Sequence, residues 1–337
     1  MIETGDRGTI YLVAFQSDGM QLLSGNYDGV RRWRVADGQE VGNQMTMNLS
    51  AISVSSDGKW IVCGTSRGAS VWDAQMQEKV IGVAGKDYVD AVDISPESTR
   101  FTTAAGGHGD NNASIWDIIT GERLVGPLQH DGYITGIKFS LNGEHIATAV
   151  EDHSIRVFDS RNGDPLITIK ANISRWAPST PLAWSNNGQQ IFVVSSDCKL
   201  KSFDVSTGSQ LAESQVHGDG EVMSVALAAD GKFLATIARR SIMFWDTSTL
   251  TQIGPAIEDT QRIRSIALSP DCSYLATGGF DGNIIIRSLN NSLPDLYGPF
   301  RVSNYAFIIL LDWSHIVFVL LISPLGTYSR RSRISQT

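Results

Sequence analysis

Cysteine is scarce in this chain, and its three cysteines, Cys63, Cys198 and Cys272, lie far apart. An odd number without a C-x-x-C pair gives neither a disulfide framework nor a cysteine metal knuckle. The opening residues, MIETGDRGTI, lack a basic segment followed by an apolar run, so we expect no secretory signal. These features are typical of a reducing compartment. We expect a cytoplasmic protein, with a nuclear location and membrane anchoring left open.

Positive charge is also in short supply, with 27 basic against 35 acidic residues and a formal charge of −8. Residues 301–337 contain four arginines and one aspartate, a local charge of +3, so the preceding 300 residues carry −8 − 3 = −11. A body this acidic repels phosphate backbones, whereas nucleic-acid binders usually show the opposite imbalance. The sequence therefore predicts no nucleic-acid partner.

The first 300 residues lack a long amphipathic helical period, and two short patterns recur in its place. One is a turn resembling S-x-[D/N]-G, whose third residues are Asp18, Asp57, Glu97, Asn142, Asn187, Asp230 and Asp271, in steps of 39, 40, 45, 45, 43 and 41. The other closes a short apolar strand, usually with an aromatic–acid pair, at Trp33-Arg34, Trp72-Asp73, Trp116-Asp117, Phe158-Asp159, Phe203-Asp204, Trp245-Asp246 and, in degenerate form, Arg287-Ser288. The second pattern has a mean spacing of (287 − 33)/6, about 42 residues, as expected for a four-stranded propeller blade of ~40–45 residues.

Each repeat contains four β-rich runs separated by Gly, Asn, Asp and Ser clusters, which indicates a β-meander. The sequence predicts an all-β fold: a seven-bladed β-propeller of four-stranded antiparallel blades at 1–302, with an atypical hydrophobic C-terminal tail at 303–337. We expect blades at approximately 10–48, 49–86, 87–130, 131–172, 173–217, 218–260 and 261–302.

The seventh blade raises the question of how the ring closes. About nine residues precede the first strand, too few for a typical ~5–6-residue strand and a loop. The segment LYGPFRVS matches LVGPLQHD and QIGPAIED in earlier repeats. We therefore expect the seventh blade to supply its own outer strand, giving a ring without an interlocking strap or a piece of a longer array.

The W-D pairs, the turns and the period resemble the WD40-repeat family over residues 10–300. The segment TGERLVGPLQHDG also resembles blade linkers of fungal WD40 arrays. The resemblance implies a propeller that scaffolds protein complexes. It also implies a buried structural network in many blades, which only the fourth blade approaches, with His130, Thr148, Asp152 and Phe158. Because Phe158 has no N–H to donate, we expect that network to be incomplete.

Propellers bind partners through a rim made by two sets of connections: those entering each first strand and those joining the second and third strands. The repeat places the following candidates there: Tyr27, Asp28, Arg67, Tyr88, His108, Asp110, Asp131, Tyr133, Asp152, His153, Trp176, Asp197, Arg239, Arg240, Phe280 and Asp281. Their mixture of aromatic, basic and acidic side chains suits a protein or peptide. We predict a non-catalytic interaction scaffold with no catalytic residue, cofactor or metal. An enzyme site in the propeller channel is an alternative that would need catalytic groups converging from several blades.

The tail contains AFIILLDWSHIVFVLLISPL at 306–325, which nearly has the ~20 residues of a membrane span. Asp312 near its middle would cost roughly 2.5–3.5 kcal/mol on insertion. Three interpretations stay open: a membrane anchor that would tether the scaffold, an element packed on the propeller, and a tail not shaped by folding.

Other motifs have plain structural interpretations. The sequence Gly64–Gly68 matches the G-x-S-x-G nucleophile motif but is expected on a strand-to-strand turn, whereas the motif needs a strand-to-helix turn. The loop Gly106–Asn112 is either a recognition loop or an insertion, and Trp176 is either a binding anchor or a core residue. None of the six histidines stands two or four residues from another, so no metal cluster is predicted.

Overall fold

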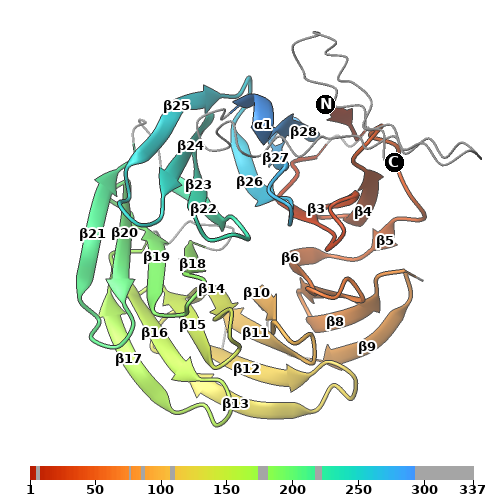
Figure 1. Cartoon of the computed structure of the whole chain (residues 1–337). Helices are drawn as coiled ribbons and strands as arrows, with labels where there is room; N and C mark the ends of the chain where they lie inside the picture. Colours follow the sequence, from red (N-terminus) through yellow and green to blue (C-terminus); the bar gives the residue numbers. More distant parts are fainter. Residues whose placement is uncertain are drawn as a thin grey trace, which may run out of the picture. The chain divides into compact units, whose positions relative to one another are not determined.

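The computed structural model describes residues 1–4, 8–75, 77–84, 88–106, 111–173, 181–216 and 222–292. The chain divides into two compact units, Met1–Ser292 and Leu293–Thr337, and the described residues all belong to the first. In this unit seven four-stranded antiparallel sheets stand around a central axis (Figure 1). Apart from one helical turn, α1 (Leu289–Ser292), the regular structure of the described residues is all β, and the predicted seven-bladed propeller is confirmed.

Strands follow one another outward through each blade, and we call the four positions a to d. Blade 1 contains β2 (Leu12–Phe15), β3 (Gln21–Asn26), β4 (Gly29–Arg34) and β5 (Met45–Thr46). Blade 2 contains β6 (Leu49–Val54), β7 (Trp60–Thr65), β8 (Gly68–Asp73) and β9 (Lys79–Ala84). Blade 3 contains β10 (Tyr88–Ile94), β11 (Arg100–Gly106), β12 (Asn112–Asp117) and β13 (Arg123–Gln129). Blade 4 contains β14 (Ile134–Phe139), β15 (His145–Val150), β16 (Ser154–Asp159) and β17 (Pro165–Lys170).

The last three blades follow the same order until the final position. Blade 5 contains β18 (Leu182–Trp184), β19 (Gln190–Val194), β20 (Lys199–Asp204) and β21 (Gln210–Gln215). Blade 6 contains β22 (Val222–Leu227), β23 (Phe233–Ala238), β24 (Ser241–Asp246) and β25 (Gln252–Glu258). Blade 7 contains β26 (Ile263–Leu268), β27 (Tyr274–Gly279), β28 (Asn283–Ser288) and, in the d position, the N-terminal strand β1 (Ile2–Glu3).

The recurring S-x-[D/N]-G turn joins strands a and b, and its local hydrogen bonds explain its composition. In blade 2 the Asp57 carboxylate accepts a hydrogen bond from the Ser55 hydroxyl at 2.6 Å and from the Lys59 amide at 3.0 Å. Such bonds from a short side chain to nearby groups favour a turn over a continued strand. Gly58 then adopts a φ of +72°, and Ser98 and Cys272 take the equivalent conformation, both at +59°, in blades 3 and 7. Those two turns therefore hold a backbone conformation that is uncommon for residues other than glycine.

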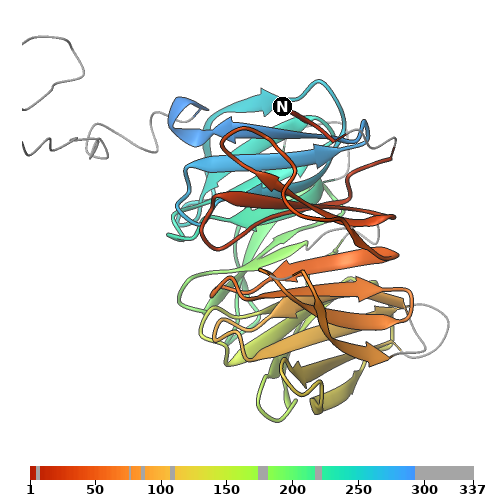
Figure 2. The same ribbon diagram turned by 90° about the vertical axis from the view of Figure 1, so that its right-hand side faces the viewer.

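The core lies between blades, because each blade packs its apolar faces on its neighbours. Ile155 and Val157 of blade 4, for example, belong to one buried cluster with Ile191 and Val193 of blade 5. Blades 7 and 1 meet in the same way, although they lie at opposite ends of the propeller sequence, as the adjacent blue and red strands of Figure 2 show. Packing of this kind is complete only when the ring is closed.

The expectation of a ring without a strap was wrong. β1 pairs antiparallel with β28 in the register Ile2↔Ile284 and supplies the outer strand of blade 7. The Thr4 hydroxyl donates to the Gly282 carbonyl at 2.6 Å, and Arg31 of blade 1 donates to the Thr4 carbonyl at 2.7 Å. Ile2 is 5% exposed within the cluster between blades 7 and 1. A two-residue strand held by one buried side chain and these polar bonds fits into the nine residues that had been considered too few.

The segment LYGPFRVS and the hydrophobic tail lie outside the described residues, so the three interpretations of 306–325 stay predictions. Over the part of the chain that the structure describes, no helix combines the length and apolarity needed to cross a membrane.

Candidate protein-binding face

One end of the propeller carries both the b–c turns and the connections that lead into strands a, because alternate turns of an antiparallel meander lie at the same end. We call this end the rim face. The structure places ten predicted candidates in b–c turns: Tyr27, Asp28, Arg67, Asp152, His153, Asp197, Arg239, Arg240, Phe280 and Asp281. It places Asp131, Tyr133 and Tyr88 at or just before the start of strands a. Tyr88 and Tyr133 are half-buried and the other described candidates are exposed, whereas His108, Asp110 and Trp176 lie outside the described residues.

The rim face of blades 7 and 1 carries a group that we call the arginine–aromatic cluster: Tyr11, Tyr27, Arg262, Arg264 and Phe280. The rings of Tyr11 and Tyr27 are 4.6 Å apart between centroids. The Arg264 guanidinium lies 5.5 Å from the Tyr11 ring centroid and 5.6 Å from that of Phe280. Arg262 lies over the same Phe280 ring at 5.3 Å. Burial raises the pKa of the Tyr11 hydroxyl, with its hydrogen bond to Tyr27 adding to the effect, and burial lowers the pKa of Arg264.

Sequence reasoning found Tyr27 and Phe280 but missed the other three members of the cluster. Tyr11 and Arg264 occupy the same place in the repeat as Ser50, Asp90 and Thr135, five residues before the first residue of each a–b turn. Aligning the repeats on that turn would have shown this position to be variable and to contain aromatic and charged residues. The signal was therefore present in the sequence, but no residue type marked it.

A second group of rim residues lies at blades 3 and 4. Burial raises the pKa of the Tyr133 hydroxyl, and its hydrogen bond to Asp90 raises it further. Arg156 of β16 forms ion pairs with Asp131 at 2.8 Å and with Asp152 at 3.0 Å. Hydrogen bonds from Ser154 and Arg156 lower the pKa of Asp152, although burial acts in the opposite direction. These acidic groups thus have partners, but one arginine against two carboxylates leaves the ion-paired group with a net negative charge.

Beneath that sector lies the network suggested for blade 4. The His130 Nδ1–H donates to the Leu128 carbonyl at 2.9 Å, which leaves Nε2 to accept from the Thr148 hydroxyl at 2.9 Å. The Phe158 ring lies edge-on to the imidazole at 5.5 Å between centroids. Asp152 faces Ser154 and Arg156 instead. Burial lowers the pKa of His130 to about 4, so the ring is neutral at physiological pH.

Blade 7 contains a polar network that the sequence did not reveal. In blade 6 the Trp245 indole N–H donates to Thr236 Oγ1 at 2.9 Å. Arg287 occupies the place of that tryptophan in blade 7, and it donates to Thr277 Oγ1 at 3.0 Å and to the Asp259 carboxylate at 2.8 Å. The Asp259 side chain is 1% exposed. The degenerate copy of the repeat therefore replaces an indole–hydroxyl bond with a buried ion pair.

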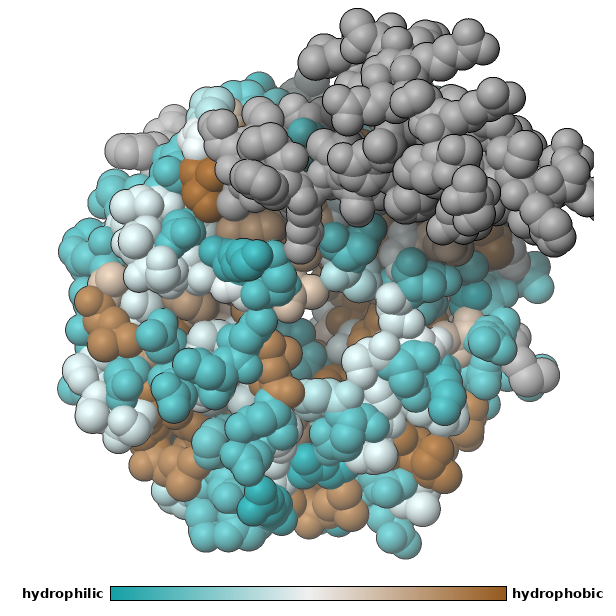
Figure 3. All heavy atoms as spheres, in the orientation of Figure 1, coloured by the Kyte–Doolittle hydropathy of each residue, from teal (hydrophilic) through white to brown (hydrophobic). Residues whose placement is uncertain are grey.

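The face of Figure 3 is hollowed at its centre, where the strands a of all seven blades line a channel of about 590 Å³. Its described ionisable lining residues are Asp90, Asp93 and Lys138. Lys138 Nζ and Asp93 Oδ1 are 2.6 Å apart, and Asp93 also accepts from the Phe139 amide at 2.9 Å. Asp93 and Lys138 thus pair with each other, and Asp90 bonds Tyr133. This arrangement leaves little acid–base chemistry for the enzyme alternative. Within the described ranges, no group of His, Cys, Asp and Glu could hold a metal ion.

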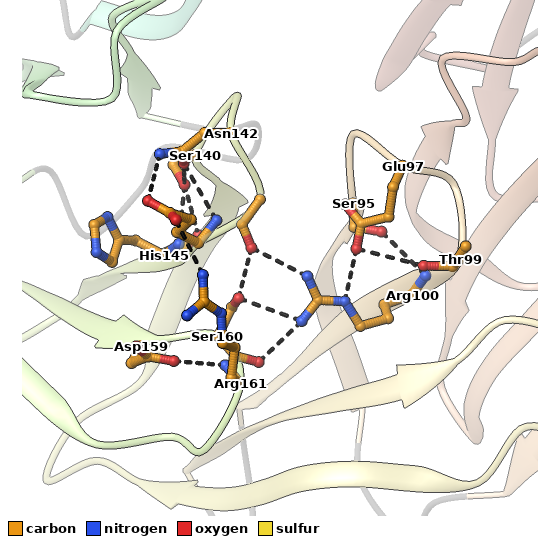
Figure 4. A network of polar contacts seen from close by, with 12 residues as sticks. Ser95, Glu97, Thr99, Arg100, Ser140, Asn142, His145, Asp159, Ser160 and Arg161 are labelled. Carbon is orange, nitrogen blue, oxygen red and sulfur yellow. Dashed lines mark hydrogen bonds and ion pairs between the residues drawn. The ribbon is translucent and has the colours of Figure 1, made fainter.

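At the other end of the propeller, polar contacts tie neighbouring blades together (Figure 4). Arg100 of β11 donates to Glu97 of its own turn at 2.7 Å and to the carbonyls of Ser160 and Gly143 in blade 4 at 3.0 and 3.1 Å. Its side chain therefore takes part in the contact between blades 3 and 4.

The motif Gly64–Gly68 lies in the β7–β8 strand-to-strand turn, as expected, where Thr65 Oγ1 donates to the Gly68 carbonyl at 2.9 Å.

Comparison with known proteins adds family evidence. The family model WD40, described as WD domain, G-beta repeat, matches residues 123–159 and 250–288. Autophagy-related protein 16 of Arabidopsis thaliana is 25% identical over 236 residues, 67% of this chain and 44% of that protein. Protein tipD of Dictyostelium discoideum is 25% identical over 307 residues, 84% of this chain and 47% of that protein. The chain therefore spans less than half the length of these two relatives.

Two further comparisons cover most of the protein that they match. The serine-threonine kinase receptor-associated protein of Dictyostelium discoideum is 23% identical over 236 residues, 69% of this chain and 78% of that protein. Among solved structures, hydrazine synthase of Kuenenia stuttgartiensis superposes with a TM-score of 0.70 at 15% identity, covering 84% of this chain and 96% of that one. At that identity the likeness shows the fold alone.

Proposed function

This chain belongs to the WD40-repeat family of β-propellers, and on that premise we propose that it is a non-catalytic scaffold whose rim face binds a protein or peptide partner. One observation carries the proposal. Two aromatic side chains of adjacent blades, Tyr27 and Phe280, are 60% and 45% exposed in b–c turns of the rim face. Aromatic residues and arginine dominate the energetics of protein interfaces, and this face presents both beside each other.

The family context supports a scaffold, because WD40 propellers generally assemble proteins and do not catalyse reactions. The name of one relative, serine-threonine kinase receptor-associated protein, describes association with a receptor for that protein. The net negative charge of the chain supports a protein partner over a nucleic acid.

The test is a selection of short random peptides displayed on phage against the immobilised full chain. We expect the selected peptides to lose binding when Tyr27→Ala and Phe280→Ala are combined. The matched control is Tyr274→Ala, which removes an aromatic side chain that is 38% exposed at the start of β27, on the opposite end of the propeller. Failure to enrich any peptide, or loss of binding only in the Tyr274 variant, would contradict the proposal.

A further inference from the structure

The arginine–aromatic cluster contains two positive charges on one aromatic ring. The guanidinium groups of Arg262 and Arg264 lie 5.3 and 5.6 Å from the centroid of the Phe280 ring. Repulsion by the Arg262 charge adds to the larger effect of burial in lowering the pKa of Arg264, because charges near a protein surface repel at an effective dielectric well below that of water. An anion in contact with both groups would relieve that repulsion.

Neither arginine forms a salt bridge with an acidic side chain among the described residues. Arg156 bonds two carboxylates, and Arg287 bonds Asp259. Arg264 is half-buried against the rings of Tyr11 and Phe280. Its Nε atom is buried without a hydrogen-bond partner in the described part of the chain, as is the Nε atom of Arg156. Stacking on aromatic rings recovers only part of the cost of burying a cation. Folding alone does not explain why this arginine lies here.

The nearest acidic side chain of the b–c turn in blade 7 is already engaged. The Asp281 carboxylate accepts hydrogen bonds from the Asn283 amide at 2.8 Å and from the Asn283 side chain at 3.0 Å. Stacking fixes the plane of a guanidinium while leaving in-plane N–H groups able to donate to an anion. The two arginines therefore present N–H donors beside the exposed rings of Tyr27 and Phe280.

We propose that the partner of the rim face is an acidic peptide that places an anionic side chain, a carboxylate or a phosphorylated hydroxyl, against Arg262 and Arg264 and an apolar side chain on the ring of Tyr27. This inference rests on the proposed function and names the chemical class of its partner. The formal charge of −8 explains why an isolated anion in a peptide fits better than a polyanion. Long-range repulsion grows with the number of charges that a ligand carries, whereas the donors of two arginines serve one anionic group.

The experiment uses the peptide selected against the full chain, labelled with a fluorophore and prepared in three forms that carry glutamate, glutamine or phosphoserine at its acidic position. Fluorescence anisotropy is expected to show that the glutamate or the phosphoserine form binds about tenfold or more tightly than the glutamine form, as charge-assisted hydrogen bonds require. The order of the two anionic forms distinguishes a carboxylate partner from a phosphorylated one.

Two variants and a matched control locate the effect. Arg262→Gln and Arg264→Gln are each expected to abolish the preference for the anionic forms. Arg123→Gln removes an arginine that also lies over an aromatic ring, that of Trp116 at 5.8 Å, but at the opposite end of the propeller, and it should leave the preference unchanged. Circular dichroism of each variant confirms that the propeller is folded.

The outcomes separate this inference from the proposed function. If all three peptide forms bind equally and neither arginine variant changes their affinity, the rim face still binds peptides but the anion site is overturned. Preference for a single-stranded oligonucleotide over the anionic peptides would also overturn it. If no peptide is selected at all, the proposed function itself fails.

Discussion

Replacing Arg287 by methionine removes the guanidinium from the polar network of blade 7 while keeping a side chain of similar length. The Asp259 carboxylate, 1% exposed, then loses its 2.8 Å partner. It keeps the Thr260 amide at 2.7 Å and the Thr277 hydroxyl at 3.4 Å. Removing one member of a buried ion pair costs about 3–5 kcal/mol. Because two hydrogen bonds to the carboxylate survive, we expect a loss near the lower end, about 3 kcal/mol.

Thermal and urea unfolding followed by circular dichroism measure this loss. The unit Met1–Ser292 should have an unfolding entropy of about 0.6 kcal/mol/K, at about 2.1 cal/mol/K per residue, so the melting temperature should fall by about 5 °C. The double variant Asp259→Leu and Arg287→Met leaves no buried charge, so we expect it to recover most of the stability. Arg34→Met is the matched control. It removes an arginine from the end of strand c in blade 1, and the carboxylate partner of this arginine, Asp37, is exposed. We expect no measurable change for it.

Two results would refute this reasoning. If Arg287→Met is no more destabilising than Arg34→Met, the ion pair does not contribute to the stability of blade 7. If the double variant is as unstable as the single one, the loss arises from packing and not from an unpaired carboxylate.

Two other predictions concern the fourth blade and the strap. The pKa of His130 is lowered to about 4 in the folded state, whereas that of an unfolded histidine is about 6.5. The unfolded state therefore binds a proton more readily than the folded state. The stability of the propeller that is present above pH 6.5 should be lost as the pH falls towards 4. The loss amounts to about 3 kcal/mol. Urea midpoints measured across that pH range should depend less on pH in His130→Asn than in the unchanged protein. If the pH dependence is the same in both, groups other than His130 cause the loss of stability. Ile2→Ala should destabilise the propeller by about 2 kcal/mol, because the Ile2 side chain is 5% exposed. Glu3→Ala, which changes the neighbouring exposed residue, should not destabilise it. If urea unfolding shows equal effects for the two variants, closure of the ring by β1 is contradicted.

The propeller could be predicted from the sequence because its two recurring patterns have local causes. A turn such as Ser55–Gly58 forms its hydrogen bonds within a few residues, so its composition reveals it wherever it occurs. The strap could not be predicted this way. A strand of two residues has no periodicity, and its position depends on bonds from Thr4 to Gly282 and from Arg31 to Thr4 across the closed ring.

The candidate site was predicted in outline for the same reason. The repeat fixes which turns reach the rim face, so Tyr27 and Phe280 were placed there in advance. The contacts among them depend on residues of different blades, such as Arg264 beside Tyr11, which are adjacent only after the ring forms. Arg287 likewise looked like a degraded tryptophan position until its distance to Asp259 was known.

The pairing of β1 with β28 joins two strands that are synthesised at very different times. β1 leaves the ribosome first, but its partner is made about 280 residues later, a delay of roughly 14–56 s at typical elongation rates of ~5–20 residues per second. Throughout that interval the apolar face of blade 1 that later packs on blade 7 has no neighbour. The nascent chain therefore exposes apolar surface that can aggregate or bind chaperones. Nascent chains stalled before β28 should therefore be digested readily by protease, whereas chains released after it should resist digestion. The first strand to be translated completes the last blade.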